Sequence, residues 1–424
     1  MPEATAPEAG PPTATQLEPD GNDDPIDPGS GPLPTSLQLV RVGRAPMALQ
    51  RICHLTPFGN ELYASHANQP LGTDGATITR YQPGASEDER YPEKPSFHVA
   101  FDWNRPGEPT KGGGGGQGFL RVHAIGGRLF VPDTDPPYAG FGLVDHGTEG
   151  YVFVSDAAGH FEAPRAPGHR PPPPPTPDRE GRAGAAVLPR AYHVLDVIRF
   201  RGRMYASTGA VPPTEKAWTG ASPGALLVAR PTWDRWTYEV DYPYPWKAGV
   251  WRLTYLVRFH DKLFAGLQDY DGREPNDYVV FDPPKDSAAI AHDDARAVRA
   301  TDQGAALTLR WYADAGKLWW IAIERGAGSV LRVTSDGETW SVVPLPAEAG
   351  QPTDVVRYHD AVVALTEWGL WRVDVDPPVV LAHVTGKRSP FRVDDAFCSA
   401  PLTVFQGRLY AGDQRDGALW RLDP

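Results

Sequence analysis

The chain has 424 residues, a formal net charge of −12 at pH 7 and 41% hydrophobic residues, which is enough apolar material for a folded core. The acidic balance is not interrupted by a basic stripe, so we expect no nucleic-acid partner. The 44 glycines and 46 prolines indicate many turns between short elements, and long amphipathic helical windows are hard to find. We therefore expect a mostly β protein.

The first 35 residues are rich in Pro, Gly and acidic side chains and contain no Lys or Arg. Such a segment buries too little apolar surface to fold, so we expect residues 1–35 to be disordered and residues 36–424 to form one domain.

Two interpretations of the cellular location stay open. No apolar run approaches the roughly 20 residues of a membrane helix, and the start of the chain lacks the features of a signal peptide. Taken literally, this predicts a cytoplasmic protein without a transmembrane segment. The Pro-rich acidic spacer would equally suit the tether of a bacterial surface protein whose signal has been removed, and the protein would then be extracellular or surface-tethered.

The ordered part begins with an isolated strand at residues 36–43, where Ser36–Val42 alternates apolar and polar side chains without a nearby hairpin partner. Seven repeated units follow, each with a tight turn between two short strands. The turns fall at Phe58–Asn60, Gly126–Gly127, Arg201–Gly202, His260–Asp261, Ala315–Gly316, His359–Asp360 and Gln406–Gly407. Their spacing runs from 44 to 75 residues, which brackets the roughly 40–50-residue period of propeller blades once insertions are allowed.

Most units contain four readable strands, but the last one stops after three, at Asp423. The isolated N-terminal strand supplies the missing fourth, which would remove the exposed edges of an open array. We therefore predict an all-β fold, a seven-bladed β-propeller of four-stranded antiparallel blades, with the ring closed by the N-terminal strand.

The long insertions lie between second and third strands, as at Asp133–Gly150 and Thr208–Gly224, or between units, as at Pro164–Arg190. Because strand direction alternates, all of these connections emerge on one face of the ring, which we call the insertion face. The opposite face carries the tight turns and is called the turn face. Loops gathered on one face predict the working surface.

The repeated units resemble β-propeller blades, and Thr334-Ser-Asp-Gly-Glu-Thr-Trp340 resembles the Asp-box turn of sialidase-like propellers. It lies between third and fourth strands, as in that family, and is one residue shorter than the usual form. In that family the Asp box is a structural turn away from the ligand, so the resemblance implies the fold and not sialidase activity. Gly126-Gly127 is similar to the kelch double glycine, and the WD40 signature is absent.

The densest polar loop, Gln268–Tyr278, contains four side chains that could supply oxygen ligands to calcium. These residues are Asp269, Asp271, Asn276 and Asp277. The loop fails the full EF-hand pattern, so calcium binding and an acidic solvated turn both remain open. Calcium is the one cofactor that the sequence suggests.

Catalytic candidates come from two patterns. His193 and Arg252 both stand nine residues before the second residue of their turn, near the insertion face. His193 could act as a base, or it could be a hydrogen-bonded structural histidine. The carboxylates Asp133, Glu367 and Asp413 could supply an acid/base pair for glycoside cleavage, but the sequence does not give their separation.

Aromatic and polar residues in the insertions are candidate ligand contacts. Trp218 and Trp246 suit carbohydrate stacking or protein contact, and Tyr270 and Arg273 belong to the polar loop. Without a catalytic motif, the favoured hypothesis is a monomeric, non-enzymatic propeller that binds a protein or glycan through its insertion face. The alternative is a glycan-active enzyme, a glycoside hydrolase or polysaccharide lyase, with rim carboxylates in the central funnel.

The only two cysteines, Cys53 and Cys398, lie near opposite ends of the repeated region. They could be two separate buried thiols or a covalent link between the first and last units, which a closed ring would bring together.

Overall fold

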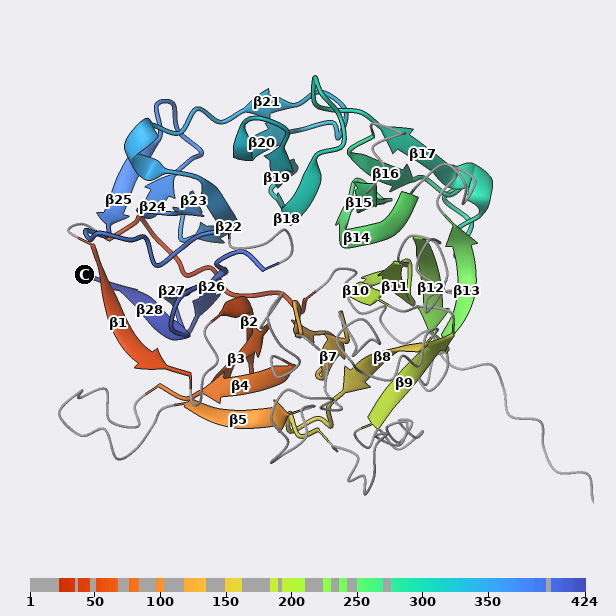
Figure 1. Ribbon diagram of the computed structural model, residues 1–424, viewed down its shortest axis with the longest axis horizontal. Helices are drawn as coiled ribbons and strands as arrows, with labels where there is room; N and C mark the ends of the chain where they lie inside the picture. The colour runs from red at the N-terminus through yellow and green to blue at the C-terminus, as the bar shows by residue number, and fades with distance from the viewer. Residues whose placement is uncertain are drawn as a thin grey trace, which may run out of the picture.

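The protein is built almost entirely from β-strands, arranged around a central axis as a β-propeller (Figure 1). This architecture comes from a computed structural model that describes residues 23–34, 37–45, 51–67, 76–83, 97–102, 118–134, 149–161, 184–189, 193–209, 224–229, 236–241, 250–269, 276–393 and 398–424. Among these residues, no helix has the length and apolar character needed to span a membrane.

Five separate four-stranded antiparallel sheets form blades. The first three contain β2 (Ile52–Phe58), β3 (Glu61–His66), β4 (Thr77–Tyr81) and β5 (Phe97–Asp102); β6 (His123–Ala124), β7 (Leu129–Pro132), β8 (Glu149–Val154) and β9 (Gly184–Pro189); and β18 (Leu307–Asp314), β19 (Lys317–Glu324), β20 (Gly328–Thr334) and β21 (Ser341–Val342). The other two contain β22 (Pro352–Tyr358), β23 (Ala361–Thr366), β24 (Gly369–Arg372) and β25 (Val379–His383); and β26 (Leu402–Phe405), β27 (Arg408–Gly412), β28 (Ala418–Asp423) and β1 (Gln38–Arg44).

The remaining eight strands form one continuous sheet, so the prediction of seven separate blades is wrong. These strands are β10 (His193–Phe200), β11 (Arg203–Gly209), β12 (Ala225–Ala229), β13 (Trp236–Asp241), β14 (Val250–Phe259), β15 (Lys262–Asp269), β16 (Tyr278–Phe281) and β17 (Ala295–Val298). The two halves join where Gly209 of β11 pairs with Arg252 of β14. A side chain on Gly209 would come within 2.2 Å of the Arg252 side chain, so the glycine permits this close approach.

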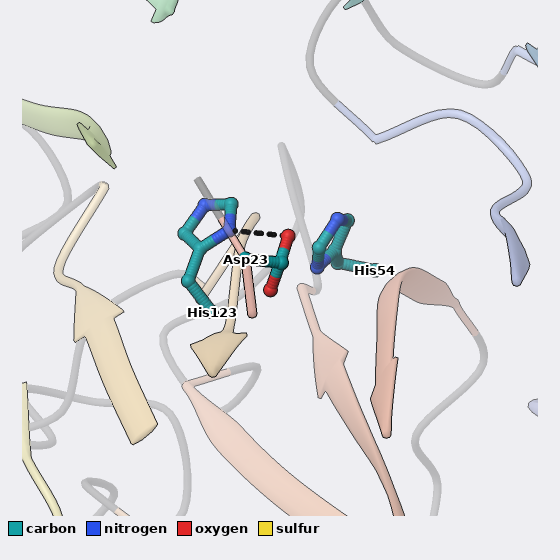
Figure 2. A group of neighbouring side chains, drawn as sticks. All are labelled: Asp23, His54 and His123. Carbon is teal, nitrogen blue, oxygen red and sulfur yellow. Dashed lines mark hydrogen bonds and ion pairs between the residues drawn. The ribbon is translucent and has the colours of Figure 1, made fainter. Parts of the chain in front are cut away.

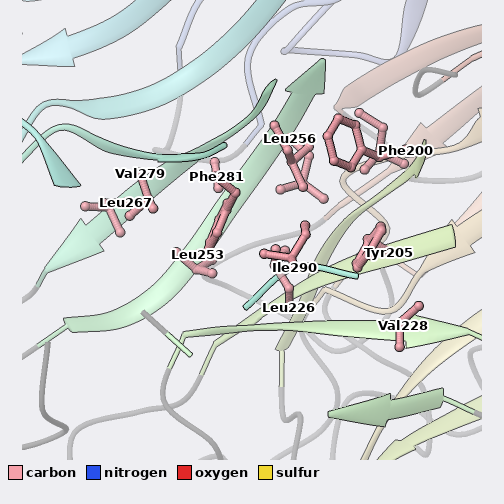
Figure 3. Packing of buried hydrophobic residues seen from close by; sticks show 13 residues of the cluster. Phe200, Tyr205, Leu226, Val228, Leu253, Leu256, Leu267, Val279, Phe281 and Ile290 are labelled. Carbon is pink, nitrogen blue, oxygen red and sulfur yellow. The ribbon is translucent and has the colours of Figure 1, made fainter. Parts of the chain in front are cut away.

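One hydrophobic cluster spans both halves of the eight-stranded sheet. Figure 3 shows Phe200 and Leu226, from β10 and β12, in the same cluster as Leu253 and Phe281, from β14 and β16. All four side chains are fully buried. The core is therefore distributed between neighbouring four-strand groups around the ring, which is how propeller blades pack. In the described connections, η4 (His292–Asp294) and η5 (Ala347–Ala349) are short 3₁₀ helices.

The pairing predicted for the N-terminal strand is present. β1 runs antiparallel to β28, with Leu39 opposite Leu422, so the last blade contains the first and the last described strands. The strand begins at Gln38 and ends at Arg44, close to the predicted 36–43. Its register shifts between Arg41 and Gly43, which marks a β-bulge in this outer strand.

The tight turns also occur where the sequence predicts them, with backbone conformations that explain their residues. Gly126 and Gly127 have φ of 59° and 70°, and Gln406 and Gly407 have φ of 49° and 71°. Positive φ at both central residues is the type I′ geometry that follows the twist of a β-hairpin, and glycine adopts it without steric cost.

Residues 23–34 have a defined path, although the composition of residues 1–35 predicts disorder. In Figure 1 this segment crosses the middle of the ring before it enters β1. The Asp24 carboxylate accepts hydrogen bonds from the amides of Gly126 and Gly127, at 2.8 and 3.2 Å, and the His359 amide donates to Pro28 O at 2.7 Å. The segment is thus held by polar contacts with the turns, which a test of apolar content does not detect.

The turn between β20 and β21 lies between a third and a fourth strand, as predicted. Asp336 Oδ1 accepts hydrogen bonds from the amides of Glu338 and Thr339, at 2.8 and 2.7 Å. These two amides, together with the Thr334 hydroxyl, hold the pKa of Asp336 well below its usual range. Trp340 then donates its indole N–H to the Tyr278 hydroxyl at 2.8 Å, which ties this turn to the neighbouring sheet.

Candidate functional site

One level of the central channel is built from equivalent positions of the innermost strands. The residue six positions before the last residue of each turn belongs to this central layer, whose members are His54, Arg121, Asp196, Tyr255, Arg310, Asp354 and Pro401. A register shift lies immediately before or at this position in β2, β10, β14, β18 and β22. Such bulges redirect a side chain, here in five innermost strands at equivalent positions.

Two arginines of the central layer fill the middle of the channel. Arg121 Nη2 donates to Leu309 O at 2.9 Å, and its guanidinium lies 3.6 Å from the centre of the Tyr255 ring. Arg310 Nη2 donates to Cys53 O at 2.7 Å and to Ser399 O at 3.1 Å. Both arginines are at most 4% exposed. Their donors are used to connect innermost strands from different parts of the ring, which is a structural role.

Two aspartates of the same layer connect consecutive innermost strands. Asp196 Oδ2 accepts from the Leu256 amide at 2.8 Å, and Asp354 Oδ2 accepts from the Leu402 amide at 2.8 Å. Asp354 also lies 3.1 Å from Arg310 Nε. Burial raises the pKa of Asp354 to about 7, although the amide donors and the Arg121 charge oppose this rise.

Three of the predicted catalytic candidates lie close together nearer the insertion face. His193 Nδ1 donates to Thr134 O at 2.8 Å, and its Nε2 accepts from Arg252 Nη2 at 3.0 Å. The backbone oxygen of Asp133 accepts from the Val194 amide at 3.3 Å, and the Asp133 side chain is fully buried. Both ring nitrogens of His193 are thus engaged, which matches the structural interpretation of this histidine better than the catalytic one.

Glu367 and Asp413 belong to other blades, in the turns that follow β23 and β27. Glu367 Oε2 accepts from the Gln351 amide at 3.2 Å, and Asp413 Oδ1 accepts from the amides of Arg415 and Asp416 at 2.8 and 2.9 Å. Burial raises the pKa of Asp413 to about 6, and a hydrogen bond shared with the Asp416 carboxyl adds to the rise. Each carboxylate organises its own turn, and an acid/base role for either stays a prediction.

The predicted calcium loop is only partly within the described chain. Asp277 is fully buried, and its carboxylate accepts from the amides of Ala300, Thr301 and Ala306, each at 2.7 Å. These contacts fix the loop before β18 and use the oxygens that would bind an ion. Asn276 precedes it, and the backbone of Asp269 ends β15. The remaining loop and insertion candidates, Asp271, Tyr270, Arg273, Trp218 and Trp246, lie outside the described residues.

Cys53 and Cys398 form a disulfide, with Cα atoms 4.7 Å apart and a sequence separation of 345. Both are fully buried beside Leu120 and Tyr255 of the channel. The bond joins β2 to the connection that leads into β26, so the first and last repeated units are covalently linked. Of the two interpretations of the cysteines, the covalent link is the one present in the structure.

A cavity of about 710 Å³ occupies the turn-face side of the channel. The central layer provides its floor through His54, Arg310 and Asp354, and the turn at His260 and the N-terminal segment from Asp23 to Ile26 form part of its wall. The insertion-face candidates His193 and Arg252 do not line this cavity.

At the edge of this cavity, Asp23, His54 and His123 come together (Figure 2). Asp23 Oδ2 lies 3.1 Å from His123 Nδ1, and Asp196 Oδ1 lies 2.7 Å from His123 Nε2. Burial disfavours the charged imidazolium, but the two carboxylates outweigh it and raise the pKa of His123 to about 9. This group is not among the candidates predicted from the sequence, because Asp23 falls in the segment predicted to be disordered. One signal in the sequence could have indicated His54: it stands at the same distance before its turn as the other members of the central layer.

Comparison with known proteins adds support for the fold and no family. No protein-family model and no curated protein matches the chain. The extracellular domain of a putative hybrid two-component system from B. thetaiotaomicron has a TM-score of 0.50 and 11% identity, with 92% of this chain aligned to 42% of that one.

Two further solved structures have TM-scores of 0.46. A catalytically inactive virginiamycin B lyase from Staphylococcus aureus is 8% identical, over 92% of this chain and 100% of that one. A protein of unknown function from Dyadobacter fermentans is 11% identical, over 91% and 99%. At such identities the similarity concerns the fold alone. The chain is a β-propeller protein.

Proposed function

We propose that the protein is a non-enzymatic binding propeller that engages a protein or glycan through its insertion face. The central layer carries this proposal. Arg121 and Arg310 extend to backbone oxygens of other innermost strands, at 2.9 and 2.7 Å, so the central layer consists of buried, mutually engaged groups. Catalysis in a central funnel needs accessible acid and base groups next to a substrate.

The arrangement near the insertion face supports the same proposal. His193 and Arg252 are 2% and 7% exposed and bind each other, so they stabilise the ends of the innermost strands. Recognition is then left to the insertions, which include the candidate contacts Trp218 and Trp246. Loops displayed on a rigid scaffold are a common location for binding residues.

We also propose that the eight-stranded sheet consists of two blades, which gives a seven-bladed ring closed by β1. One residue pair, Gly209 with Arg252, joins its halves, whereas β10 pairs with β11 and β14 with β15 over most of their lengths. A crystal structure would test this count. Seven groups of strands at similar angles about one axis would support it, and an open gap beside β1 would contradict it.

Binding to a glycan array and to an array of surface proteins tests the proposed function. We expect a saturable ligand whose binding falls at least about tenfold in Trp218→Ala or Trp246→Ala, because aromatic contacts dominate such interfaces. The turn-face variant Arg258→Ala is the control and should bind normally. Cleavage of any arrayed glycan, lost in Asp133→Asn, would instead establish the glycan-active alternative.

A further inference from the structure

We propose that Asp23, His54 and His123 form a binding site for a divalent transition-metal ion, with zinc the best chemical match. The three residues come from separate parts of the chain, namely the N-terminal segment, β2 and β6. This site lies on the turn face and is independent of the proposed ligand-binding surface on the insertion face.

The donor atoms already lie near the spacing that such an ion needs. One donor atom from each residue lies within 4.8 Å of the other two. The Asp23 Oδ2 to His123 Nδ1 distance is 3.1 Å. Two ligands of a tetrahedral zinc ion, each about 2.0–2.1 Å from the metal, lie roughly 3.3 Å apart. The Asp23–His123 pair fits this geometry, and His54 needs to approach by at most about 1.5 Å.

His123 is held by a partner on the side of its ring away from Asp23. Asp196 Oδ1 lies 2.7 Å from His123 Nε2, which leaves Nδ1 directed at Asp23. Asp196 is itself fixed, because it accepts hydrogen bonds from the amides of Val197 and Leu256 at 3.0 and 2.8 Å. A carboxylate behind a metal-binding histidine orients the ring and increases its donor strength. His54 Nδ1 lies 2.8 Å from Val122 O and 3.3 Å from Thr56 Oγ1, so an ion bound through this nitrogen would replace these contacts.

The kind of donor selects the metal. Two imidazole nitrogens and one carboxylate oxygen match zinc and related transition metals, whereas calcium and magnesium prefer oxygen ligands throughout. Asp23 and His54 also line the cavity of about 710 Å³, so a fourth coordination position would face that space. Three protein ligands with one open position describe an exchangeable site rather than a closed structural one.

The decisive measurement is calorimetric titration of the tag-free, chelator-treated full chain with zinc sulfate. We expect one site per chain, weakened at least about tenfold in Asp23→Ala and in His54→Asn. His260→Asn is the matched control, because His260 lines the same cavity outside the three-residue group and should leave the affinity unchanged. Absence of binding, or equal affinity in all four proteins, would overturn the proposal.

Asp23→Ala keeps the test valid even if the histidine variant misfolds, because Asp23 belongs to the N-terminal segment and not to a blade. Cobalt substitution provides a second readout. The wild type should give the intense visible absorption of a low-coordinate Co²⁺ ion, and Asp23→Ala should lose it. Asp196→Asn should reduce zinc affinity by about 10–100-fold through the orientation of His123. An unchanged cobalt spectrum in Asp23→Ala would show that the metal binds elsewhere and would reject the site.

Discussion

At the scale of single residues, the centre of the ring depends on buried charges that each serve several strands. Arg310 contacts Cys53 O, Ser399 O and the Asp354 carboxylate at 2.7, 3.1 and 3.1 Å. A buried ion pair adds little stability when compared with an apolar replacement, but the loss of one partner leaves the other charge uncompensated. Arg310 therefore matters mainly because the Asp354 carboxylate and the two backbone oxygens are buried, and without the arginine they would have neither this partner nor water.

We expect Arg310→Ala to lower the free energy of unfolding by about 3–5 kcal/mol, because Asp354 and two backbone oxygens lose their partner. Arg296→Ala is the control, since its ion pair with Glu338 is largely exposed and contributes at most about 0.5 kcal/mol. Urea denaturation measures both values. A similar small loss in the two variants would show that the central layer relaxes or admits water.

The ionised Asp336 side chain should make the stability of the folded protein depend on pH. Its folded-state pKa is depressed, so its stabilising contribution is present above the unfolded-state value of about 3.9 and is lost as the pH falls through the folded-state value. Asp336→Ala should therefore melt a few degrees below the wild type at pH 5–8, and the difference should shrink below about pH 3.9. Melting curves across this pH range provide the test. A difference in melting temperature that stayed constant with pH would show that the charge of Asp336 does not stabilise the turn.

At the scale of elements, the N-terminal region has two parts with different roles. Residues 23–34 contact the turns of two blades through polar groups, whereas β1 supplies a whole strand to the last blade. Loss of residues 23–34 removes a few hydrogen bonds. Loss of β1 exposes the edge of β28 and the apolar side chains that β1 covers.

Two truncations separate these roles. Deletion of residues 1–43 should prevent soluble, cooperative folding, because β28 loses its partner strand. Deletion of residues 1–34 should leave a folded protein that is less stable by about 1–3 kcal/mol, the worth of a few hydrogen bonds. Solubility and urea denaturation distinguish the cases. If both truncated proteins folded equally well, β1 would not be needed to complete the blade.

The predictable elements were those specified by local sequence. The turn residues and the alternation in β1 depend on neighbouring positions, so both could be located from the sequence. The eight-stranded sheet could not be predicted, because it depends on the distant pair Gly209 and Arg252. The contacts of Asp23 were missed for a similar reason. They depend on His123, which is 100 residues away, and composition carries no information about such pairs.

At the scale of the whole molecule, the two ends of the repeated region are joined twice. The β1–β28 pairing does so by hydrogen bonds and the Cys53–Cys398 disulfide does so covalently. A disulfide that closes so long a loop restricts the unfolded chain strongly. Such bonds persist in oxidising compartments, and the extracellular alternative for this chain therefore stays a prediction that the redox state of the cysteines can test.

Replacement of both cysteines, Cys53→Ala with Cys398→Ala, should lower the free energy of unfolding by about 2–5 kcal/mol. The wild type in reducing buffer is the control and should approach the variant. Thiol titration of protein isolated from its native cells should find no reactive cysteine before reduction and two afterwards. Two thiols before reduction would place the protein in a reducing compartment.

The partnership of β1 with β28 also has a consequence for biosynthesis. β1 leaves the ribosome before all the other described strands, and β28, which pairs with it, leaves after them. At about 5–20 residues per second, β1 waits roughly 20–80 s for its partner. During this time β1 is unpaired. Its glycine and two arginines, within Gln38–Arg44, should keep it from pairing with a neighbouring chain, because charged side chains and a bulge disfavour such pairing.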